Sequence, residues 1–454
     1  MDAQVRVDLG RELGRIDPNI HGSFAEHLGR CVYGGLWVGP NSPIPNEDGI
    51  RRDVAEALRE LELPVLRWPG GCFADNYHWD WGVGPAATRQ PRHNLWWSQP
   101  EPNEFGTNEF LRLCRVVGCE PYICLNVGSG TVEEALGWVE YCNSSQDTYY
   151  TRQRRLSGHK EPYGVRYWGV GNENWGCGGT MTPEQYAWEY RKYATYLRRM
   201  DDTVRGGLYL VAGGHTDGWN FRFLREMRGA LHLVDGLSLH LYVGGYSASA
   251  TDFTEEQYYR LMGDVIEMET AVRRAVYLLE EVSPGRQIGL IVDEWGTWYP
   301  EARVTSGLYQ QNALRDALYT ACALNMFNRH CRQVAMTNMA QTVNVLQSMI
   351  LTCGSQIVKT PTYWVYYLFR PHRGGTALGC DVCVCSVADS QGREVPMVSA
   401  SASRSQDGKS LTVTLVNVSL EEGVDVQVEI QGSQVRGRPE AWVLTAEDVR
   451  AHNS

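Results

Sequence analysis

Residues 167–175 read YWGVGNENW, and residues 290–296 read LIVDEWG. Each stretch is a short apolar run that stops at a carboxylate, Glu173 in the first and Glu294 in the second. Continuous apolar runs of this length are typical of parallel strands that are buried on both faces. The two stretches therefore raise the question of what a pair of glutamates does at the ends of two buried strands.

Further segments of the same character alternate with helical patterns along the chain. The eight predicted strands are 16–24, 64–71, 120–128, 165–173, 208–214, 234–242, 287–295 and 331–340. Helical patterns lie between them, for example in 49–63, 107–118, 182–200 and 312–330. Eight strand–helix units of this kind predict an α/β fold, a (β/α)8 TIM barrel, which we place at residues 16–350.

After about residue 350 the pattern changes to β-rich runs that are separated by polar or glycine-containing turns. The runs are SLTVTLVNVSL, VDVQVEI and EAWVLTAEDV. They predict an additional C-terminal antiparallel β-sandwich, which is expected to be jelly-roll-like. The opening segment AQVRVDL also alternates, so we expect the sandwich domain to combine residues 1–15 and 351–454.

Charge and composition exclude several classes of protein. The chain has 454 residues, 43% of them hydrophobic, and a net charge of -11 with no dense basic block, which excludes a nucleic-acid-binding face. The N-terminus is charged, and no window approaches 18 consecutive apolar residues. We therefore predict a cytoplasmic protein with no membrane partner.

The 13 cysteines are scattered through apparent core segments, which favours reduced, buried thiols over a disulfide framework. The cluster CDVCVC, with Cys380, Cys383 and Cys385, has no second half at zinc-finger spacing. No structural metal is predicted.

Polar residues gather where the predicted strands end, which is where the active site of a (β/α)8 barrel lies. These residues are Glu26, His27, residues 67–72, Asn126, Asn172, Glu173, His240, Tyr242, Glu294, Trp298, Asn338 and Gln341. The chain has no phosphate-binding loop, zinc-protease motif or serine-hydrolase elbow. A pair of carboxylates among aromatic and amide residues remains, and glycoside hydrolysis requires such a pair: one acid protonates the leaving oxygen, and the other attacks the anomeric carbon or activates water.

Structural interpretations stay open for several of these residues. A glutamate at a strand end is often a solvated loop residue, Cys72 has the default of an inert thiol, and Gln341 can cap a helix. Asp293 competes with Glu294, but neighbouring strand residues face opposite sides, so only one of the two is expected to point into the site. We choose Glu294.

Eight motifs carry a resemblance to a known family. They are HGSFAEHLGRCVYGGLW, LRWPGGCFADNYHW, NEFGTNEFLRLC, NVGSGT, WGVGNENWGCGG, LSLHLY, VDEWGTWY and AQTVNVLQ. Together, in consistent order over residues 16 to 350, they resemble glycoside hydrolase family 51, the intracellular-type α-L-arabinofuranosidases. The resemblance implies a retaining mechanism with Glu173 as general acid/base and Glu294 as nucleophile. It assigns the furanose pocket to Glu26, Cys72, Asn172, His240, Tyr242, Trp298 and Gln341.

The resemblance implies an exo-acting enzyme that releases terminal L-arabinofuranose from arabinoxylan- or arabinan-derived oligosaccharides by double displacement, without cofactor or metal. Because the family commonly forms homo-oligomers, we expect one here. Two departures, Trp81 within Asp80–Gly82 and Trp97–Ser98, leave the aglycone open. A β-D-galactofuranosidase, a dual-specificity furanosidase, an endo-glucanase and a non-catalytic sugar-binding protein remain alternatives.

These roles set physical expectations for the site. Tyr242 is expected to donate a hydrogen bond to Glu294, and Asn172 to contact the sugar 2-OH. Burial and the nearby charge of Glu294 are expected to raise the pKa of Glu173. A retaining mechanism also predicts the two carboxyl groups to lie about 5 to 5.5 Å apart.

Overall fold

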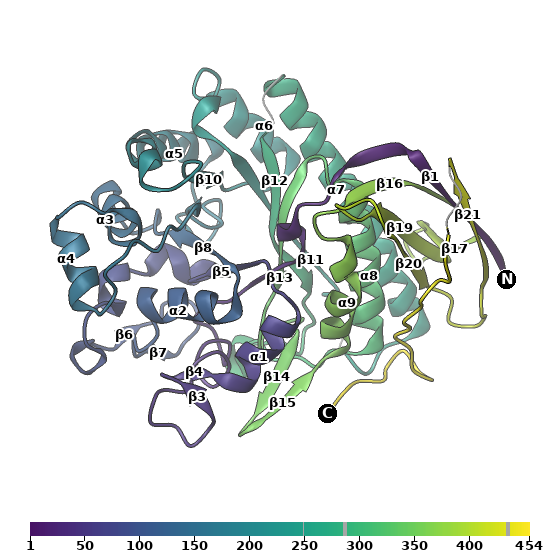
Figure 1. Ribbon diagram of the computed structural model, residues 1–454, viewed down its shortest axis with the longest axis horizontal. Coiled ribbons are helices and arrows are strands. Elements are labelled where there is room, and N and C mark those ends of the chain that lie inside the picture. Colours follow the sequence, from purple (N-terminus) through teal and green to yellow (C-terminus); the bar gives the residue numbers. More distant parts are fainter. Residues whose placement is uncertain (248, 285–287, 433–435) are drawn as a thin grey trace.

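A computed structural model describes residues 1–247, 249–284, 288–432 and 436–454 (Figure 1). Eight parallel strands close into a barrel in the order β10-β11-β12-β13-β2-β5-β8-β9. Their bounds are β2 Gly22–Phe24, β5 Val65–Trp68, β8 Glu120–Leu125, β9 Tyr167–Val170, β10 Tyr209–Ala212, β11 Gly236–Val243, β12 Gly289–Thr297 and β13 Val334–Ala340. Each strand overlaps one of the eight predicted segments, and the predicted (β/α)8 barrel is confirmed.

The first predicted strand is only partly extended. Residues Pro18–His21 form a 3-10 helix, and the strand proper is confined to Gly22–Phe24. The side chain of Asp17 accepts a hydrogen bond from the backbone N–H of Asn19, and Pro18 fixes the first helical position. This cap-and-proline pair starts a turn where the apolar pattern alone indicates a strand.

The helices lie outside the barrel (Figure 1). They are α1 Arg52–Glu60, α2 Thr107–Val117, α3 Val132–Asn143, α4 Tyr149–Leu156, α5 Pro183–Leu197, α6 Asp217–Glu226, α7 Glu255–Val282, α8 Leu314–Arg329 and α9 Pro361–Phe369. Local signals set their ends: α5 begins at a capping box between Thr182 and Gln185, and α2 ends at Gly118 in the left-handed region. In the part of the chain that the structure describes, no helix is both long enough and apolar enough to span a bilayer.

The barrel interior is apolar below the strand ends. It is filled by Val65, Ala74, Tyr122, Cys124, Val211, Ile291 and Met336. Above this layer lies the guanidinium of Arg67, which is buried on β5. The interior is therefore a packed core that turns polar towards the carboxyl ends of the strands.

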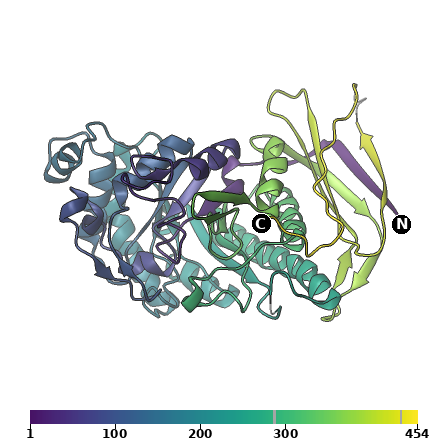
Figure 2. The ribbon, with the colours of Figure 1, turned by 90° about the horizontal axis from the view of Figure 1, so that it is seen from below.

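A second, strand-rich part packs against α8 at one side of the barrel (Figure 2). Its five-stranded sheet has the order β20-β19-β16-β1-β21. The strands are β1 Asp2–Arg15, β16 Thr376–Cys383, β19 Val398–Arg404, β20 Leu411–Asn417 and β21 Asp425–Gln431. The opening segment thus adds a strand to this sheet as expected, although β1 and β21 pair in parallel whereas the other pairs are antiparallel.

Short two-stranded ribbons complete the described strands: β3 Asn46–Glu47 with β4 Ile50–Arg51, β6 Arg92–His93 with β7 Pro100–Glu101, β14 Ile350–Cys353 with β15 Gln356–Lys359, and β17 Ser386–Ala388 with β18 Glu394–Pro396. Helix α9 follows the β14–β15 ribbon and packs against α8. The division at residue 350 stays a prediction.

The last predicted β-run, 440–449, is not a strand. Instead, the carbonyls of Val449 and Ala451 accept hydrogen bonds from the backbone N–H groups of Arg315 and Leu314. These are the first N–H groups of α8, which have no partner inside the helix. Capping this helix end therefore replaces strand pairing at the C-terminus.

Candidate active site

The residues that the sequence places at strand ends meet at one end of the barrel. Asn172 and Glu173 follow β9, His240 and Tyr242 lie within β11, and Glu294 lies within β12. Hydrogen bonds join them into one network, described below. The predicted strand-end site is therefore a physical cluster.

Glu173 occupies an unusual backbone position. Its φ of 41° lies in the left-handed region that a glutamate rarely adopts. One carboxylate oxygen, Oε1, lies 2.7 Å from Nδ1 of His240. Strain of this kind is found where the surrounding structure holds a side chain in a required direction, here towards β11.

Glu294 is held through both carboxylate oxygens. Nη1 of Arg67 donates to Oε1 at 2.8 Å, and the Tyr242 hydroxyl donates to Oε2 at 2.8 Å, as the sequence predicted. Nη2 of Arg67 also donates to Oδ1 of Asn172 at 2.6 Å. One guanidinium therefore fixes Glu294 and the neighbour of Glu173 together.

The two glutamates bracket His240. Its Nδ1 lies 3.5 Å from Oε2 of Glu294 in addition to its contact with Glu173. The contacting nitrogen of His240 and one oxygen from each glutamate all lie within 4.8 Å of one another. The two carboxyl groups thus face the same small space.

Asp293 corrects the expectation that only one of two adjacent residues points inwards. Its Oδ1 lies 3.4 Å from Nε2 of His240, so both acids contact the same imidazole. Ser238 pairs with Ile291 and His240 with Glu294, so β12 advances three residues where β11 advances two. The extra residue is a β-bulge, which breaks the alternation on which the expectation rested.

The pKa values differ from those expected. Burial disfavours a charge on His240, but the charges of Glu294, Asp293 and Glu173 prevail and raise its pKa to about 10. Burial also acts to raise the pKa of Glu173, but the hydrogen bond and charge of His240, aided by Arg67, lower it overall. The predicted rise for Glu173 is therefore wrong, because the sequence did not reveal that a cation contacts it.

Glu26 forms a second polar group at the rim. Its Oε1 accepts hydrogen bonds from the backbone of Phe73 and the indole of Trp97, and its Oε2 accepts one from Gln341 at 3.1 Å. Burial and the charge of Glu294 raise its pKa to about 7. A Cβ on Gly70 or Gly71 would lie within 3.0 Å of this carboxyl group, which explains the glycine pair.

Trp298 follows β12 and packs edge-on against the ring of Tyr242, with the centroids 5.4 Å apart. Its indole donates to the carbonyl of Ala302 at 3.1 Å. The ring therefore lies beside the tyrosine that holds Glu294.

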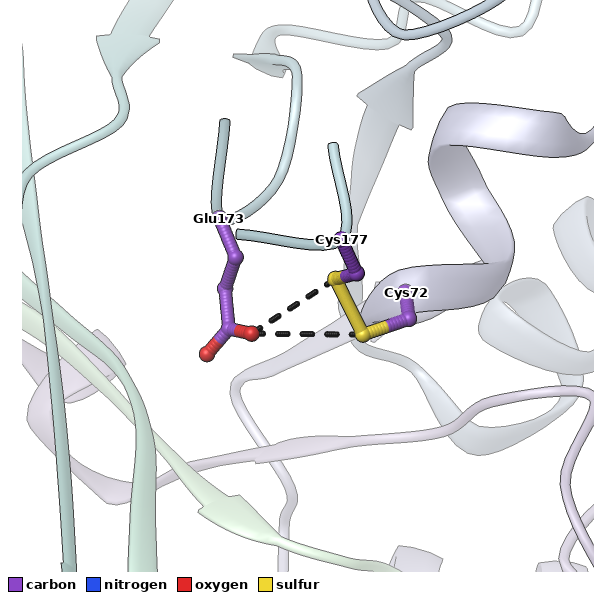
Figure 3. Close-up of side chains that lie close together, drawn as sticks. All are labelled: Cys72, Glu173 and Cys177. Atoms are coloured by element: carbon purple, nitrogen blue, oxygen red, sulfur yellow. Dashed lines mark hydrogen bonds between the residues drawn. A yellow bond between two sulfur atoms is a disulfide. The ribbon is translucent and has the colours of Figure 1, made fainter. Parts of the chain in front are cut away.

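Cys72 is not a free thiol. It forms a disulfide with Cys177, and the two sulfur atoms lie 3.9 and 3.6 Å from Oε2 of Glu173 (Figure 3). The expectation of reduced thiols is wrong for this pair, whereas eight of the remaining cysteines are buried and free. The partners are 105 residues apart, and only closure of the barrel brings their loops together.

Two buried residues complete the site: one lies outside the predicted strand-end residues, and the other stood among them without an assigned role. Asp75, in the 3-10 helix Cys72–Asn76, accepts three backbone N–H bonds, one of them from Asn172. Arg67 is the other. The sequence offered two signals for these residues: Arg67 is a charge inside the apolar run VLRW, and Asp75 is an acid that soon follows that run.

A (β/α)8 barrel whose strand ends present two carboxylates around one imidazole has the fold and site of a glycoside hydrolase. The match to an α-L-arabinofuranosidase 1 domain covers residues 57–217, and the match to an α-L-arabinofuranosidase C-terminal domain covers residues 293–454. An intracellular exo-α-L-arabinofuranosidase of Bacteroides ovatus is 43% identical over 99% of this chain and 88% of its own length.

Solved structures agree with the sequence comparison. The family 51 arabinofuranosidase of Xanthomonas axonopodis pv. citri has a TM-score of 0.91 and 37% identity, covering 96% of this chain and 89% of its own. The Thermotoga maritima α-L-arabinofuranosidase, solved as an arabinose complex, has a TM-score of 0.85 and 34% identity, covering 95% and 88%. The chain belongs to glycoside hydrolase family 51, the α-L-arabinofuranosidases.

Proposed function

We propose that this protein is a retaining, exo-acting α-L-arabinofuranosidase that releases terminal L-arabinofuranose from arabinoxylan- and arabinan-derived oligosaccharides. The spacing of the two glutamates carries the proposal, since one oxygen of each lies within 4.8 Å of the other. Retaining glycosidases hold their carboxyl groups about 5 to 5.5 Å apart, whereas inverting enzymes need about 6.5 to 9.5 Å to admit a water.

In the first step Glu294 attacks the anomeric carbon while Glu173 protonates the leaving glycosidic oxygen. The aglycone departs as an alcohol, and a glycosyl–Glu294 ester remains. In the second step Glu173 takes a proton from water, whose oxygen attacks the anomeric carbon and frees Glu294. Because these two groups supply both the proton and the nucleophile, the scheme requires no metal or cofactor.

The proton for the first step is held by the pair Glu173 and His240. Their contact atoms are 2.7 Å apart, and the raised pKa of His240 keeps one proton in the pair at neutral pH. Transfer across this hydrogen bond makes Glu173 the acid and His240 neutral. When Glu294 becomes an ester its negative charge disappears, and Glu173 can then act as the base.

The remaining pocket residues supply binding. Asn172 hydrogen-bonds the sugar 2-OH, a contact that strengthens as positive charge develops, and its hydrogen bond from Arg67 supports this role. Glu26 and Gln341 offer polar atoms to the other hydroxyl groups, with Oε1 of Gln341 buried and unpartnered within the described residues. The name of the Bacteroides ovatus relative and the arabinose in the Thermotoga maritima structure support arabinofuranose as the sugar.

Two properties of the protein in the cell belong to the same proposal. The Bacteroides ovatus relative is named intracellular, which supports a cytoplasmic location and substrates that are short oligosaccharides. Trp442 and Val443, which are 69% and 79% exposed on the C-terminal segment, support assembly into a homo-oligomer. Sedimentation velocity of the full chain tests the second point, and a monomer at micromolar concentration contradicts it.

Hydrolysis of 4-nitrophenyl α-L-arabinofuranoside by the wild type, Glu173→Ala, Glu294→Ala and the surface control Glu256→Ala tests the function. We expect Glu294→Ala to be inactive, azide to restore turnover of Glu173→Ala, and the control to match the wild type. NMR of the first product should show the α anomer. A β first product, or wild-type turnover in both glutamate variants, contradicts the mechanism.

A further inference from the structure

Three side chains form a compact group on the side of Glu173 that faces away from His240. The sulfur atoms of Cys72 and Cys177 lie 3.9 and 3.6 Å from Oε2 of Glu173, while Oε1 contacts His240 (Figure 3). In the disulfide these sulfur atoms carry no hydrogen, so they meet the carboxylate with lone pairs only. The proposed mechanism gives this arrangement no task.

We propose that reduction of the Cys72–Cys177 disulfide creates a binding site for a thiophilic divalent cation, with Zn²⁺ as the reference ion, and that the bound cation blocks the enzyme. The ligands are the two thiolates and Oε2 of Glu173. The effect on activity rests on the proposed acid/base role of Glu173, whereas the binding itself does not.

The distances match those of a tetrahedral zinc site. Zinc binds thiolate sulfur at about 2.3 Å and carboxylate oxygen at about 2.0 to 2.2 Å, so tetrahedral angles require S···O separations of about 3.5 to 3.7 Å and an S···S separation of about 3.8 Å. The two S···O distances are already 3.6 and 3.9 Å. Only the two sulfur atoms, which are bonded to each other in the disulfide, have to separate.

The surrounding loops stay anchored when the disulfide opens. The backbone N–H of Asn172 donates to Asp75 at 2.8 Å, and the side chain of Asn174 donates to the carbonyl of Gly178 at 2.8 Å. These bonds hold both sides of Cys177 without the sulfur bridge. Oε1 of Glu173 also keeps its hydrogen bond to His240, which orients the ligand oxygen as outer partners do in zinc sites.

The cation site forms in two steps, reduction of the disulfide and then binding of the cation. A low-molecular-weight dithiol gives one hydrogen to each sulfur atom and becomes a cyclic disulfide, and the half-buried position of both cysteines leaves them within its reach. The cation then displaces both thiol protons to water and forms two S–Zn bonds and one O–Zn bond, with water in the fourth position. The charge of the cation on Oε2 keeps the whole carboxyl group of Glu173 in its carboxylate form, so Oε1 has no proton to give to the leaving oxygen.

Cobalt titration under nitrogen tests the site, because thiolate-to-cobalt charge transfer gives an absorption band that a carboxylate or histidine site lacks. Enzyme reduced with a dithiol and desalted should show this band at one ion per chain, should lose it to competing Zn²⁺, and should lose arabinofuranoside hydrolysis in proportion to bound Zn²⁺. The oxidised enzyme should show neither effect.

Cys177→Ser should lose the band, whereas Cys353→Ala, which removes an exposed cysteine outside the site, should keep it. Reduced wild type alkylated with iodoacetamide provides the same comparison without a substitution. A band in the oxidised enzyme or in Cys177→Ser overturns the site, and full activity at saturating Zn²⁺ overturns the inhibition. Failure of the proposed function is a separate result, since metal-free oxidised enzyme would then not cleave the arabinofuranoside.

Discussion

Replacement of Asp75 by asparagine should weaken both the fold and the activity. Oδ1 of Asp75 accepts from the backbone N–H groups of Val127 and Gly128, and Oδ2 accepts from that of Asn172, each at 2.8 Å. The carboxylate is buried and joins the segment after β5 to the loops after β8 and β9. Asn172 and Glu173, the proposed acid/base, are positioned through the last of these bonds.

The cost follows from the geometry. Asparagine retains one oxygen for two of the bonds but turns an amide N–H towards the N–H of Asn172. One hydrogen bond to a charged group, worth about 1.5 to 3 kcal/mol, is lost, and a buried N–H is left unpaired at about 1 to 3 kcal/mol. The loss is therefore about 2.5 to 6 kcal/mol in total.

The effect should depend on pH. Burial raises the pKa of Asp75 to about 7 although three backbone N–H groups oppose this. Because this pKa lies above the ordinary value of an aspartate, the folded wild type takes up a proton near pH 7 that the unfolded chain does not yet bind, and its stability rises as pH falls from 8 to 5, whereas asparagine does not titrate. The stability difference between the two proteins should therefore be larger at pH 5 than at pH 8.

Scanning calorimetry at pH 8 should show a Tm lower by roughly 3 to 9 °C, since an unfolding entropy of about 2.1 cal/mol/K per residue makes 1 kcal/mol worth about 1.4 °C in a barrel of this length. The kcat/KM should fall about 10- to 100-fold, because small displacements of catalytic groups are costly. Asp17→Asn is the control, since Asp17 caps a 3-10 helix at the opposite end of β2 and asparagine caps equally well. Wild-type Tm and kcat/KM in Asp75→Asn at pH 8 would refute the reasoning.

Three further predictions concern the same network. Tyr242→Phe removes the 2.8 Å hydrogen bond to Glu294 and should lower kcat/KM about 10- to 150-fold, as expected for a bond to a charged group; a loss below about threefold contradicts this. His240→Gln should move the basic limb of the pH profile of kcat/KM to lower pH. The reason is that the raised pKa of His240 keeps a proton in its pair with Glu173 until pH rises through about 10. A basic limb at the wild-type position would show that the pair does not hold the catalytic proton. Gly178→Ala would place a Cβ 2.1 Å from the carbonyl oxygen of Asn172 and 2.3 Å from Oδ2 of Asp75. Such overpacking should lower the free energy of unfolding by about 1 to 3 kcal/mol, so Tm and kcat should both fall. Gly218→Ala is the control, because its Cβ would meet open space and should change neither.

The barrel and the strand-end cluster were predictable because both follow from local pattern. A parallel strand that is buried on both faces has an apolar sequence, and the polar residues at its carboxyl end lie at the mouth of the barrel. Glu173, His240 and Tyr242 were found by this rule alone. Residues 440–449 show its limit, since the same alternation there cannot reveal that backbone carbonyls cap α8 instead of pairing with a strand.

Features that depend on contacts across the barrel were not predictable. The Cys72–Cys177 bridge joins loops 105 residues apart, and no spacing rule selects that pair among 13 cysteines. The bulge that turns Asp293 inwards depends on the register between β11 and β12, which the sequence of β12 alone does not contain. In both cases the missing information is which segments become neighbours.

The wrongly expected pKa of Glu173 has a consequence for the whole site. Among the described residues, Asp293, Glu173 and Glu294 form ion pairs with two cations, Arg67 and His240, so this ionised group of five has one negative charge in excess. An oxocarbenium-like transition state adds positive charge to this space, and a buried negative excess stabilises it. Protonating Glu173 outright in the free enzyme would remove that excess. In the proposed mechanism the proton stays on His240, one hydrogen bond from Glu173, so Glu173 remains a carboxylate and the group keeps its negative excess until the leaving oxygen is protonated.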